Sequence, residues 1–333
     1  MRIGELGEQG LIKKISVLIG GSREHGDVGI GDDAALTAGS PGKWLVTSKD
    51  LLVEDVHFLR SINPADLGYK SLAVNLSDIA AMGANPRHAY VGLALPKDIT
   101  VEYVLDFYRG MQGLASQHQV SISGGDTVRS PGPLMVSVTV QGEVDREQAL
   151  LRSGASPGDL LCLTGPLGAS AAGLLLLLHD DLDCPAQVRQ TALSAHIRPV
   201  PRLAEARFLA ASGAVTAAMD NSDGLLKDLS EICVGSHCGA LLFAEKIPVH
   251  AVAREIAPLR GIEPLAMALN GGEDYELLFT ASAQRFPALA AAYQQQFGIA
   301  LCAFGEITKK TGIVMATKGR KRERIEFKGF QHF

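Results

Sequence analysis

The sequence predicts a two-domain α/β (α+β) protein, and three observations lead to this fold class. Short β-rich runs alternate with patterns of helical period along the whole chain. The chain has 333 residues, of which 47 % are apolar, and this suffices for two domains that each bury a core. A polar stretch and then a turn-rich stretch occupy residues 145–158. We therefore predict an N-terminal domain over residues 1–148 and a C-terminal domain over residues 149–333.

In the first domain, the helices are predicted from the spacing of apolar residues. Asp66 to Met82 is the clearest helix, because its apolar residues recur at helical spacing and form one stripe. Gly83 is its expected stop. A second helix is predicted over Val101 to His118. The predicted strands are Trp44 to Ser48, Ala89 to Leu95, Val120 to Ser123 and Leu134 to Val144.

The second domain is predicted to alternate in the same way. A strand over Leu160 to Thr164 leads through a glycine turn into an Ala/Leu-rich helix that starts near Gly168. This turn lacks the Gly-Lys-Ser/Thr ending of a P-loop, so it either binds an anion at the helix N-terminus or is simply a tight turn. The further predicted strands are Ala214 to Met219, Ala240 to Phe243, Tyr275 to Thr280 and Cys302 to Glu306.

Composition excludes several classes of protein. The formal charge of -5 argues against a non-specific nucleic-acid binder, and we interpret the basic cluster at residues 318–324 as a solvated hairpin. The five cysteines are scattered, without the spacing of a disulfide framework or a zinc site. The N-terminus does not resemble a signal peptide, and the most apolar run, Ala171 to Leu178, is too short to span a bilayer. A cytoplasmic protein with no membrane partner is expected.

Acidic residues gather at predicted strand ends and tight turns, most of them beside glycine. They are Asp32, Asp33, Asp50, Asp126, Asp220, Asp223, Glu273 and Asp274. Glycine lets backbone N–H groups approach phosphate oxygens closely, so carboxylates in this setting suit a metal-bound phosphate. Hard oxygen ligands without a soft cluster indicate magnesium. Because several carboxylates would repel a polyphosphate, more than one Mg²⁺ ion is predicted, together with ATP.

Asp78 is a separate indication of a metal site. It interrupts an otherwise apolar helix three residues after Asn75, so the two polar side chains share a face. Taken alone, Asp78 would be expected to face solvent. Beside the other acidic groups we favour metal ligation, because a buried carboxylate needs a cation or hydrogen bonds to compensate its charge.

From end to end, the motifs resemble those of the thiamine-monophosphate kinase family, in the same order. They are Gly31-Asp32-Asp33-Ala34-Ala35, Ser48-Lys49-Asp50, Asn75-Leu76-Ser77-Asp78, Gly124-Gly125-Asp126-Thr127, Arg152-Ser153-Gly154-Ala155, Asp220-Asn221-Ser222-Asp223-Gly224, Gly271-Gly272-Glu273-Asp274-Tyr275-Glu276-Leu277 and Lys328-Gly329-Phe330. The family is part of the superfamily of aminoimidazole-ribonucleotide synthetase. That membership implies an N-terminal domain whose sheet pairs across a homodimer, with ATP and several Mg²⁺ ions between the two domains.

The resemblance also implies an activity and a set of site residues. The activity is phosphorylation of thiamine monophosphate to the diphosphate by direct in-line transfer, the last step of thiamine diphosphate biosynthesis, with no covalent nucleophile. The implied metal ligands are Asp33, Ser48, Lys49, Asp50, Asp78, Asp126, Asp220 and Asp223. The implied ATP contacts are Gly125, Asp126, Arg152 and Ser222. The implied contacts to the thiamine substrate are His57, Glu273 and Phe330.

Lys49 departs from the family pattern, which usually has Thr at this position. If the Thr side chain binds metal, Lys cannot replace it and its charge would repel the ion. If only the backbone carbonyl binds metal, Lys is tolerated and could reach a phosphate. Asp55 stands where small residues are common, and Phe330 stands where Tyr or Trp is expected. We expect activity to survive, because all the carboxylates remain.

Two alternatives stay open at the level of sequence. One is another ATP enzyme of the superfamily. The selenium-using member is disfavoured because no Cys precedes Cys162, and the hydrogenase maturation factor because the chain ends in Phe333 instead of Cys. The other is a non-catalytic nucleotide-binding relative. ADP release that depends on the acceptor would separate an enzyme from a binder.

Overall fold

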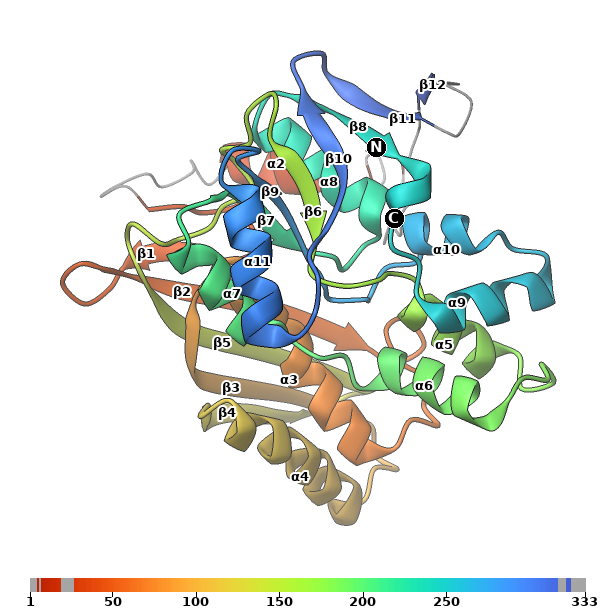
Figure 1. The fold of residues 1–333 in the computed structure, drawn as a ribbon. Helices are drawn as coiled ribbons and strands as arrows, with labels where there is room; N and C mark the ends of the chain where they lie inside the picture. The colour runs from red at the N-terminus through yellow and green to blue at the C-terminus, as the bar shows by residue number, and fades with distance from the viewer. Residues whose placement is uncertain (1–4, 6, 19–26, 317–321, 325–333) are drawn as a thin grey trace.

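The computed structural model describes residues 5, 7–18, 27–316 and 322–324, and the structural statements below refer to these. The described chain forms two β-sheets with helices packed against them (Figure 1). A short helix, α2 (Glu8–Leu18), precedes the first sheet.

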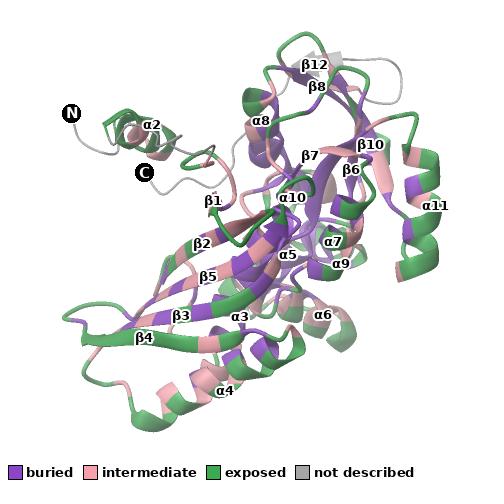
Figure 2. Ribbon diagram, turned by 90° about the vertical axis from the view of Figure 1, so that its left-hand side faces the viewer, coloured by how far each residue is buried: buried purple, intermediate pink, exposed green. Residues whose placement is uncertain are grey.

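The first sheet has five strands in the order β1-β2-β5-β3-β4. Their bounds are β1 Ala35–Ala38, β2 Lys43–Val53, β3 Asn85–Leu95, β4 Ser121–Arg129 and β5 Met135–Asp145. One face packs against α3 (Pro64–Ala81), which in turn packs against α4 (Val101–Gln117). The edge strand β4 is exposed along nearly its whole length (Figure 2). We call the face that packs against α3 the covered face, and the opposite face the open face.

The second sheet is mixed and has seven strands in the order β12-β11-β8-β10-β6-β9-β7. Their bounds are β6 Leu160–Leu163, β7 Val215–Asp220, β8 Gly239–Phe243, β9 Leu277–Ala281, β10 Cys302–Thr308, β11 Gly312–Ala316 and β12 Arg322–Arg324. Its helices are α5 Ala169–Leu178, α6 Ala186–Ile197, α7 Leu203–Ala211, α8 Leu225–Gly235, α9 Ala251–Ile256, α10 Pro264–Asn270 and α11 Phe286–Phe297. The antiparallel pair β11–β12 agrees with the hairpin predicted near the basic cluster.

Helix α3 joins the two halves of the molecule. Asn63 caps its N-terminus by accepting a hydrogen bond from the Ala65 N–H at 2.9 Å, and Pro64 occupies its first turn. Gly68 packs so closely on α4 that an added Cβ would lie 1.8 Å from the carbonyl oxygen of Phe107. On its other sides, α3 contacts α6, α7 and β7. Since the largest apolar cluster runs from the first sheet through α3 into β9 and α11, elements of both sheets meet around this helix.

The predicted α/β fold class, helices and strands are confirmed, with one consequential error. The strands β2 and β4 extend well beyond Ser48 and Ser123. Asp50 and Asp126 therefore lie inside strands rather than at strand ends or turns. The glycines before Asp126 are part of a parallel pairing with β3, so they do not form the predicted turn. The boundary between residues 148 and 149 stays a prediction; it falls between β5 and β6.

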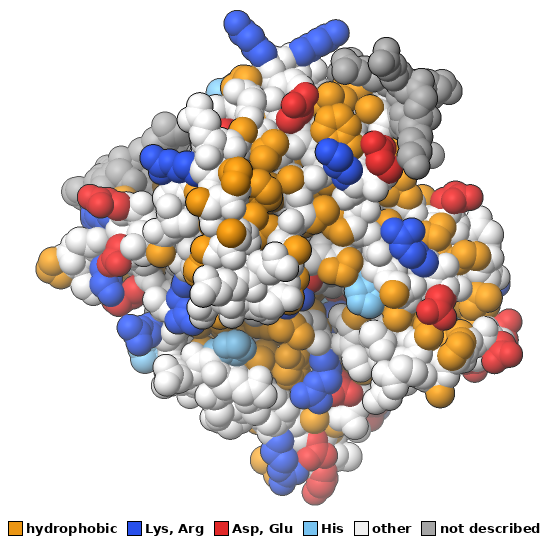
Figure 3. Space-filling view, in the orientation of Figure 1, with side chains coloured by type: hydrophobic (Ala, Val, Ile, Leu, Met, Phe, Trp, Pro, Cys, Tyr) orange, Lys and Arg blue, Asp and Glu red, His pale blue; other side chains and the backbone are white. Residues whose placement is uncertain are grey.

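The surface shows no segregation of charge on the face seen in Figure 3, where acidic and basic side chains are interspersed. Among the described residues, none of the helices is both long enough and apolar enough to cross a bilayer.

Candidate active site

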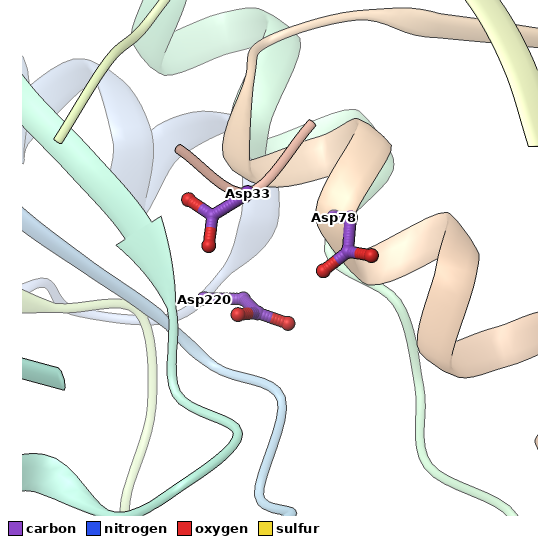
Figure 4. Close-up of side chains that lie close together, drawn as sticks. All are labelled: Asp33, Asp78 and Asp220. Atoms are coloured by element: carbon purple, nitrogen blue, oxygen red, sulfur yellow. The ribbon is translucent and has the colours of Figure 1, made fainter. Parts of the chain in front are cut away.

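Three carboxylates from distant parts of the sequence converge where the two halves of the molecule meet. Asp33 lies just before β1, Asp78 on α3, and Asp220 at the end of β7. One oxygen from each lies within 4.8 Å of the others, and the three side chains point toward a common centre (Figure 4). We call this group the acidic centre.

Each carboxylate of the acidic centre is held by a donor on one oxygen. Ser48 Oγ donates to Asp78 at 2.5 Å, and Ser77 Oγ donates to Asp220 at 2.6 Å. The Arg152 guanidinium donates to Asp33 Oδ1 through Nε at 3.2 Å and Nη2 at 2.5 Å. Asp33 Oδ2 and Asp220 Oδ1 are buried and have no hydrogen-bond partner among the described residues. Buried oxygens without a partner are the atoms that a cation would satisfy.

The electrostatics of the acidic centre also favour a cation. Burial, and then the charge of Asp33, raises the pKa of Asp220 to about 7. Burial, followed by the charges of Asp50 and Asp220, raises the pKa of Asp78 well above its ordinary value. Converging carboxylates can all stay ionised only if positive charge is placed among them. Because the donors are carboxylate and hydroxyl oxygens, the residues fit Mg²⁺.

Asp50 and Asp223 lie beside the acidic centre. Burial, and then the charge of Asp223, raises the pKa of Asp50 to about 6. Asp223 forms an ion pair with Lys227 at 2.7 Å. The Asn75 side chain accepts a hydrogen bond from the Asp50 N–H at 3.1 Å, and its Oδ1 lies 3.3 Å from Ser48 Oγ, so β2 is fastened to α3 at this point. Six of the predicted metal ligands, Ser48 and five carboxylates, are thereby brought to one region.

One buried carboxylate at this site was missed by the sequence analysis. Asp228 on α8 is 1 % exposed and accepts a hydrogen bond from Asn221 Nδ2 at 2.6 Å. Burial, and then the charge of Asp223, raises its pKa well above the ordinary value. The available signal was the one used for Asp78, an acidic residue interrupting an apolar helix.

The Lys49 ammonium does not point into the acidic centre. Adjacent residues of a strand face opposite sides of the sheet, and Ser48 faces α3. Lys49 therefore faces the open side, where Nζ donates to Ser137 Oγ at 2.8 Å. The sequence left open that Lys49, in place of the usual Thr, could repel a bound metal ion. Because its ammonium points away from the carboxylates, this geometry disfavours such repulsion.

Gly125 and Asp126 are not brought to the acidic centre within one chain. Along the register, Leu51 pairs with Ser137, which pairs with Gly92, which pairs with Asp126. Asp126 thus lies three strands from β2, about 14 Å away at the usual strand spacing, and on the open face. Asp50 is on the covered face.

The predicted substrate contacts His57 and Glu273 lie close to one another. Lys70 Nζ lies 2.9 Å from Glu273 Oε1 and donates to the His57 carbonyl oxygen at 3.5 Å. His57 Nδ1 accepts the Val53 N–H at 3.0 Å. Neither Lys70 nor the nearby His196 was singled out from the sequence, because both occur inside ordinary helical patterns. Phe330, the third predicted contact, lies outside the described residues.

The glycine-rich segment before β9 forms hydrogen bonds in two directions, to Ser222 and to the start of α5. Glu273 N–H donates to the Ser222 carbonyl oxygen at 2.7 Å, which places a predicted substrate contact beside a predicted ATP contact. Asp274 accepts hydrogen bonds from the N–H groups of Gly168 at 2.6 Å and Ser170 at 3.1 Å. The first turn of α5 thus binds an anion, which was one of the two alternatives for this turn, and that anion is a carboxylate of the chain itself.

Comparison with known proteins places this architecture in a class. The model of the AIR synthase related protein N-terminal domain matches residues 31–144, and that of the AIR synthase related protein C-terminal domain matches residues 156–318. The fold and the acidic centre therefore define an AIR synthase related protein. The hydrogenase maturation protein HypE of Escherichia coli shares the fold, at a TM-score of 0.70 and 20 % identity over 85 % of each chain.

More similar relatives define the family within that class. Thiamine-monophosphate kinase of Escherichia coli (strain K12) is 37 % identical over 98 % of both chains, and that of Bacillus subtilis (strain 168) is 38 % identical over 92 % of this chain and 94 % of the relative. The solved complex of AaThiL with AMPPCP and TMP has a TM-score of 0.88 at 32 % identity, covering 100 % of this chain and 99 % of the other. The chain belongs to the thiamine-monophosphate kinase family, so the resemblance seen in its motifs is confirmed.

Proposed function

We propose that this chain transfers the γ-phosphoryl group of ATP to thiamine monophosphate in the cytoplasm, forming thiamine diphosphate and ADP. The observation that carries the proposal is the acidic centre, whose two unpartnered buried oxygens suit a cation, in a chain with kinase relatives at 37–38 % identity. A phosphate oxygen of the acceptor attacks the γ-phosphorus while the bond from that phosphorus to the ADP oxygen breaks. No covalent nucleophile of the protein is required.

Magnesium is the proposed cofactor, with more than one ion. Asp33, Asp78 and Asp220 would hold it, with Asp50 and Asp223 beside them. Mg²⁺ would supply positive charge to the phosphoryl oxygens during transfer. Neighbouring side chains orient the carboxylates of the acidic centre. Ser48 fixes one oxygen of Asp78, Ser77 fixes one oxygen of Asp220, and Arg152 holds Asp33. Arg152 would also offer its guanidinium to the phosphates of ATP, as the family pattern implies.

A homodimer is the proposed assembly, and the position of Asp126 supports it. If Asp126 binds the same metal ion as Asp50, as the family pattern implies, the two cannot come from the same chain, because they face opposite sides of the sheet three strands apart. A second copy that pairs with this chain through the five-stranded sheet would supply its own Asp126 to the site of this chain. The proposed division into domains over residues 1–148 and 149–333 assigns that sheet to the N-terminal domain.

The proposed activity is tested by incubating the purified protein with ATP and MgCl₂ and measuring ADP. Thiamine monophosphate, thiamine or no acceptor is added. ADP release with the monophosphate alone, matched by thiamine diphosphate and abolished by EDTA, is expected. Asp78→Asn should abolish turnover, whereas Asp106→Asn, an exposed substitution on α4, should leave it unchanged. ATP binding without turnover of any acceptor would contradict the kinase activity and favour a nucleotide-binding relative.

The shared site is tested by mixing two inactive variants. If Asp126 acts in the partner's site, Asp50→Asn and Asp126→Asn chains should each be inactive alone. Exchanged subunits would form mixed dimers in which one of the two sites is intact. Random exchange then restores about a quarter of wild-type activity, because half of the dimers are mixed. Recovery of no activity, with exchange verified by native mass spectrometry, would contradict the shared site.

A further inference from the structure

A buried charged group connects both predicted acceptor contacts. The Lys70 side chain is 2 % exposed, and its ammonium lies 2.9 Å from Glu273 Oε1 and 3.2 Å from Oε2. It also donates to the His57 carbonyl oxygen. Because Lys70 sits on the rigid helix α3, it links the loop after β2 to the segment before β9. Glu273 itself is 28 % exposed and is thus the end of this network that a ligand can reach.

A second buried group lies close to the Glu273 carboxylate. His196 on α6 is buried, and its Nδ1 lies 3.2 Å from Glu273 Oε2 and 2.9 Å from Ser170 Oγ. Burial, and then the charge of Lys70, lowers the pKa of His196 to about 4, so the imidazole is neutral at physiological pH. Lys70 is therefore the cation that balances the Glu273 carboxylate, and the neutral His196 imidazole lies against one oxygen of that carboxylate.

The backbone also indicates that the position of Glu273 is imposed by its surroundings. Glu273 has φ +55° and Tyr275 has φ +52°, both in the left-handed region that non-glycine residues rarely adopt. Such conformations persist when surrounding contacts over-determine them. Here the N–H groups of these two residues are bound to the carbonyls of Ser222 and Asn221 at 2.7 and 2.9 Å, and the Glu273 side chain is bound to Lys70.

We propose that Lys70 is a positioning residue for the acceptor: its ammonium fixes the Glu273 carboxylate and the His57 loop in the geometry that binds thiamine monophosphate, without contacting the acceptor itself. This inference rests on the proposed function. It follows that Glu273 presents the acceptor with a charge-balanced carboxylate, which acts as a directed hydrogen-bond acceptor. Placement on a rigid helix is what makes such an arrangement accurate.

The test compares Lys70→Met with wild type in two measurements. Calorimetry gives the Kd of thiamine monophosphate for protein loaded with Mg²⁺ and a non-hydrolysable ATP analogue, and steady-state kinetics gives KM and kcat. Lys70→Met is expected to raise the acceptor Kd and KM by about tenfold or more, since small misplacements of binding groups have effects of this size. The Kd of the ATP analogue should be unchanged. Lys43→Met, which removes a surface ion pair with Glu143, is the matched control.

A double-mutant cycle separates positioning from a structural role. In the Glu273→Gln background there is no carboxylate to position, so adding Lys70→Met should change the acceptor Kd by less than it does in wild type, because only the contact with the His57 loop is left to lose. The double variant also leaves neither of the paired charges buried alone, which keeps the test usable if Lys70→Met folds poorly. An unchanged acceptor Kd in folded Lys70→Met, equal weakening of the ATP analogue, or fully additive effects would overturn the proposal.

The same measurements distinguish this proposal from the proposed function. Wild-type protein that binds thiamine monophosphate but does not phosphorylate it would contradict the kinase activity, while the Kd values would still decide the role of Lys70. Wild-type protein that does not bind thiamine monophosphate at all would overturn both.

Discussion

The acidic centre makes the metal-free protein less stable as pH rises, and Asp220→Asn should remove part of this loss. The pKa of Asp220 is raised from its ordinary value of 3.8 to about 7 in the folded state. The folded state therefore binds this proton more tightly than the unfolded state does. Stability from this group is fully present below pH 3.8 and is lost as pH rises through 7.

The size of the effect follows from the difference in pKa. At about 1.4 kcal/mol for each pKa unit, titration of Asp220 lowers the stability of the metal-free fold, relative to its value at low pH, by about 4 kcal/mol at pH 8 and by about 2 kcal/mol at pH 5, where only the unfolded state has ionised. Asn is isosteric and keeps an oxygen that can accept the Ser77 hydrogen bond. For 333 residues the unfolding entropy is about 0.7 kcal/mol/K, so 4 kcal/mol corresponds to about 6 °C in Tm.

The assay is thermal unfolding of wild type and Asp220→Asn in EDTA at pH 5 and pH 8, followed by titration with MgCl₂. The variant should unfold at a higher temperature than wild type in EDTA, with a larger difference at pH 8. Mg²⁺ should then raise the Tm of wild type much more than that of the variant. A ligand present at 100 times its Kd stabilises the folded state that binds it by about 2.7 kcal/mol, and the variant lacks one of the carboxylates that bind the ion. Asp106→Asn serves as the exposed control. A variant in EDTA that is no more stable than wild type at pH 8 would refute the reasoning.

Three further predictions concern separate parts of the fold. Lys49→Thr should leave acceptor-dependent ADP release within about threefold of wild type, since the ammonium faces away from the acidic centre; a variant at least tenfold faster would mean that Lys49 impairs the site. Asp274→Ala should cost about 1–2 kcal/mol of stability in urea unfolding by removing the cap of α5, and Asp274→Asn should cost less. Gly68→Ala should lower Tm by several degrees or prevent folding, because its Cβ would meet the Phe107 carbonyl at 1.8 Å; an unchanged Tm would contradict the close packing of α3 on α4.

Local sequence patterns were sufficient to predict much of the architecture. The helix over Asp66 to Met82 was predicted within two residues at its N-terminus and one at its C-terminus, because a single apolar stripe and a stop glycine mark it. Asp78 was recognised as a metal-site candidate because a carboxylate in an apolar helix is costly without compensation. The motifs also assigned Asp33, Asp78 and Asp220 to one kind of site, and in the fold one oxygen from each lies within 4.8 Å of the others.

What the sequence by itself determined about this protein was the fold class, its main elements and the chemical types of its site. Tertiary structure decided which groups meet. A shift of one residue in strand register moves every side chain of that strand to the other face of the sheet. Strand pairing therefore decided that Asp50 and Asp126 lie on opposite faces and that Lys49 points to the open face. The Lys70–Glu273 pair joins residues 203 positions apart, and no local pattern specifies a contact at that separation. Only the packing of α3 between the two sheets brings them together.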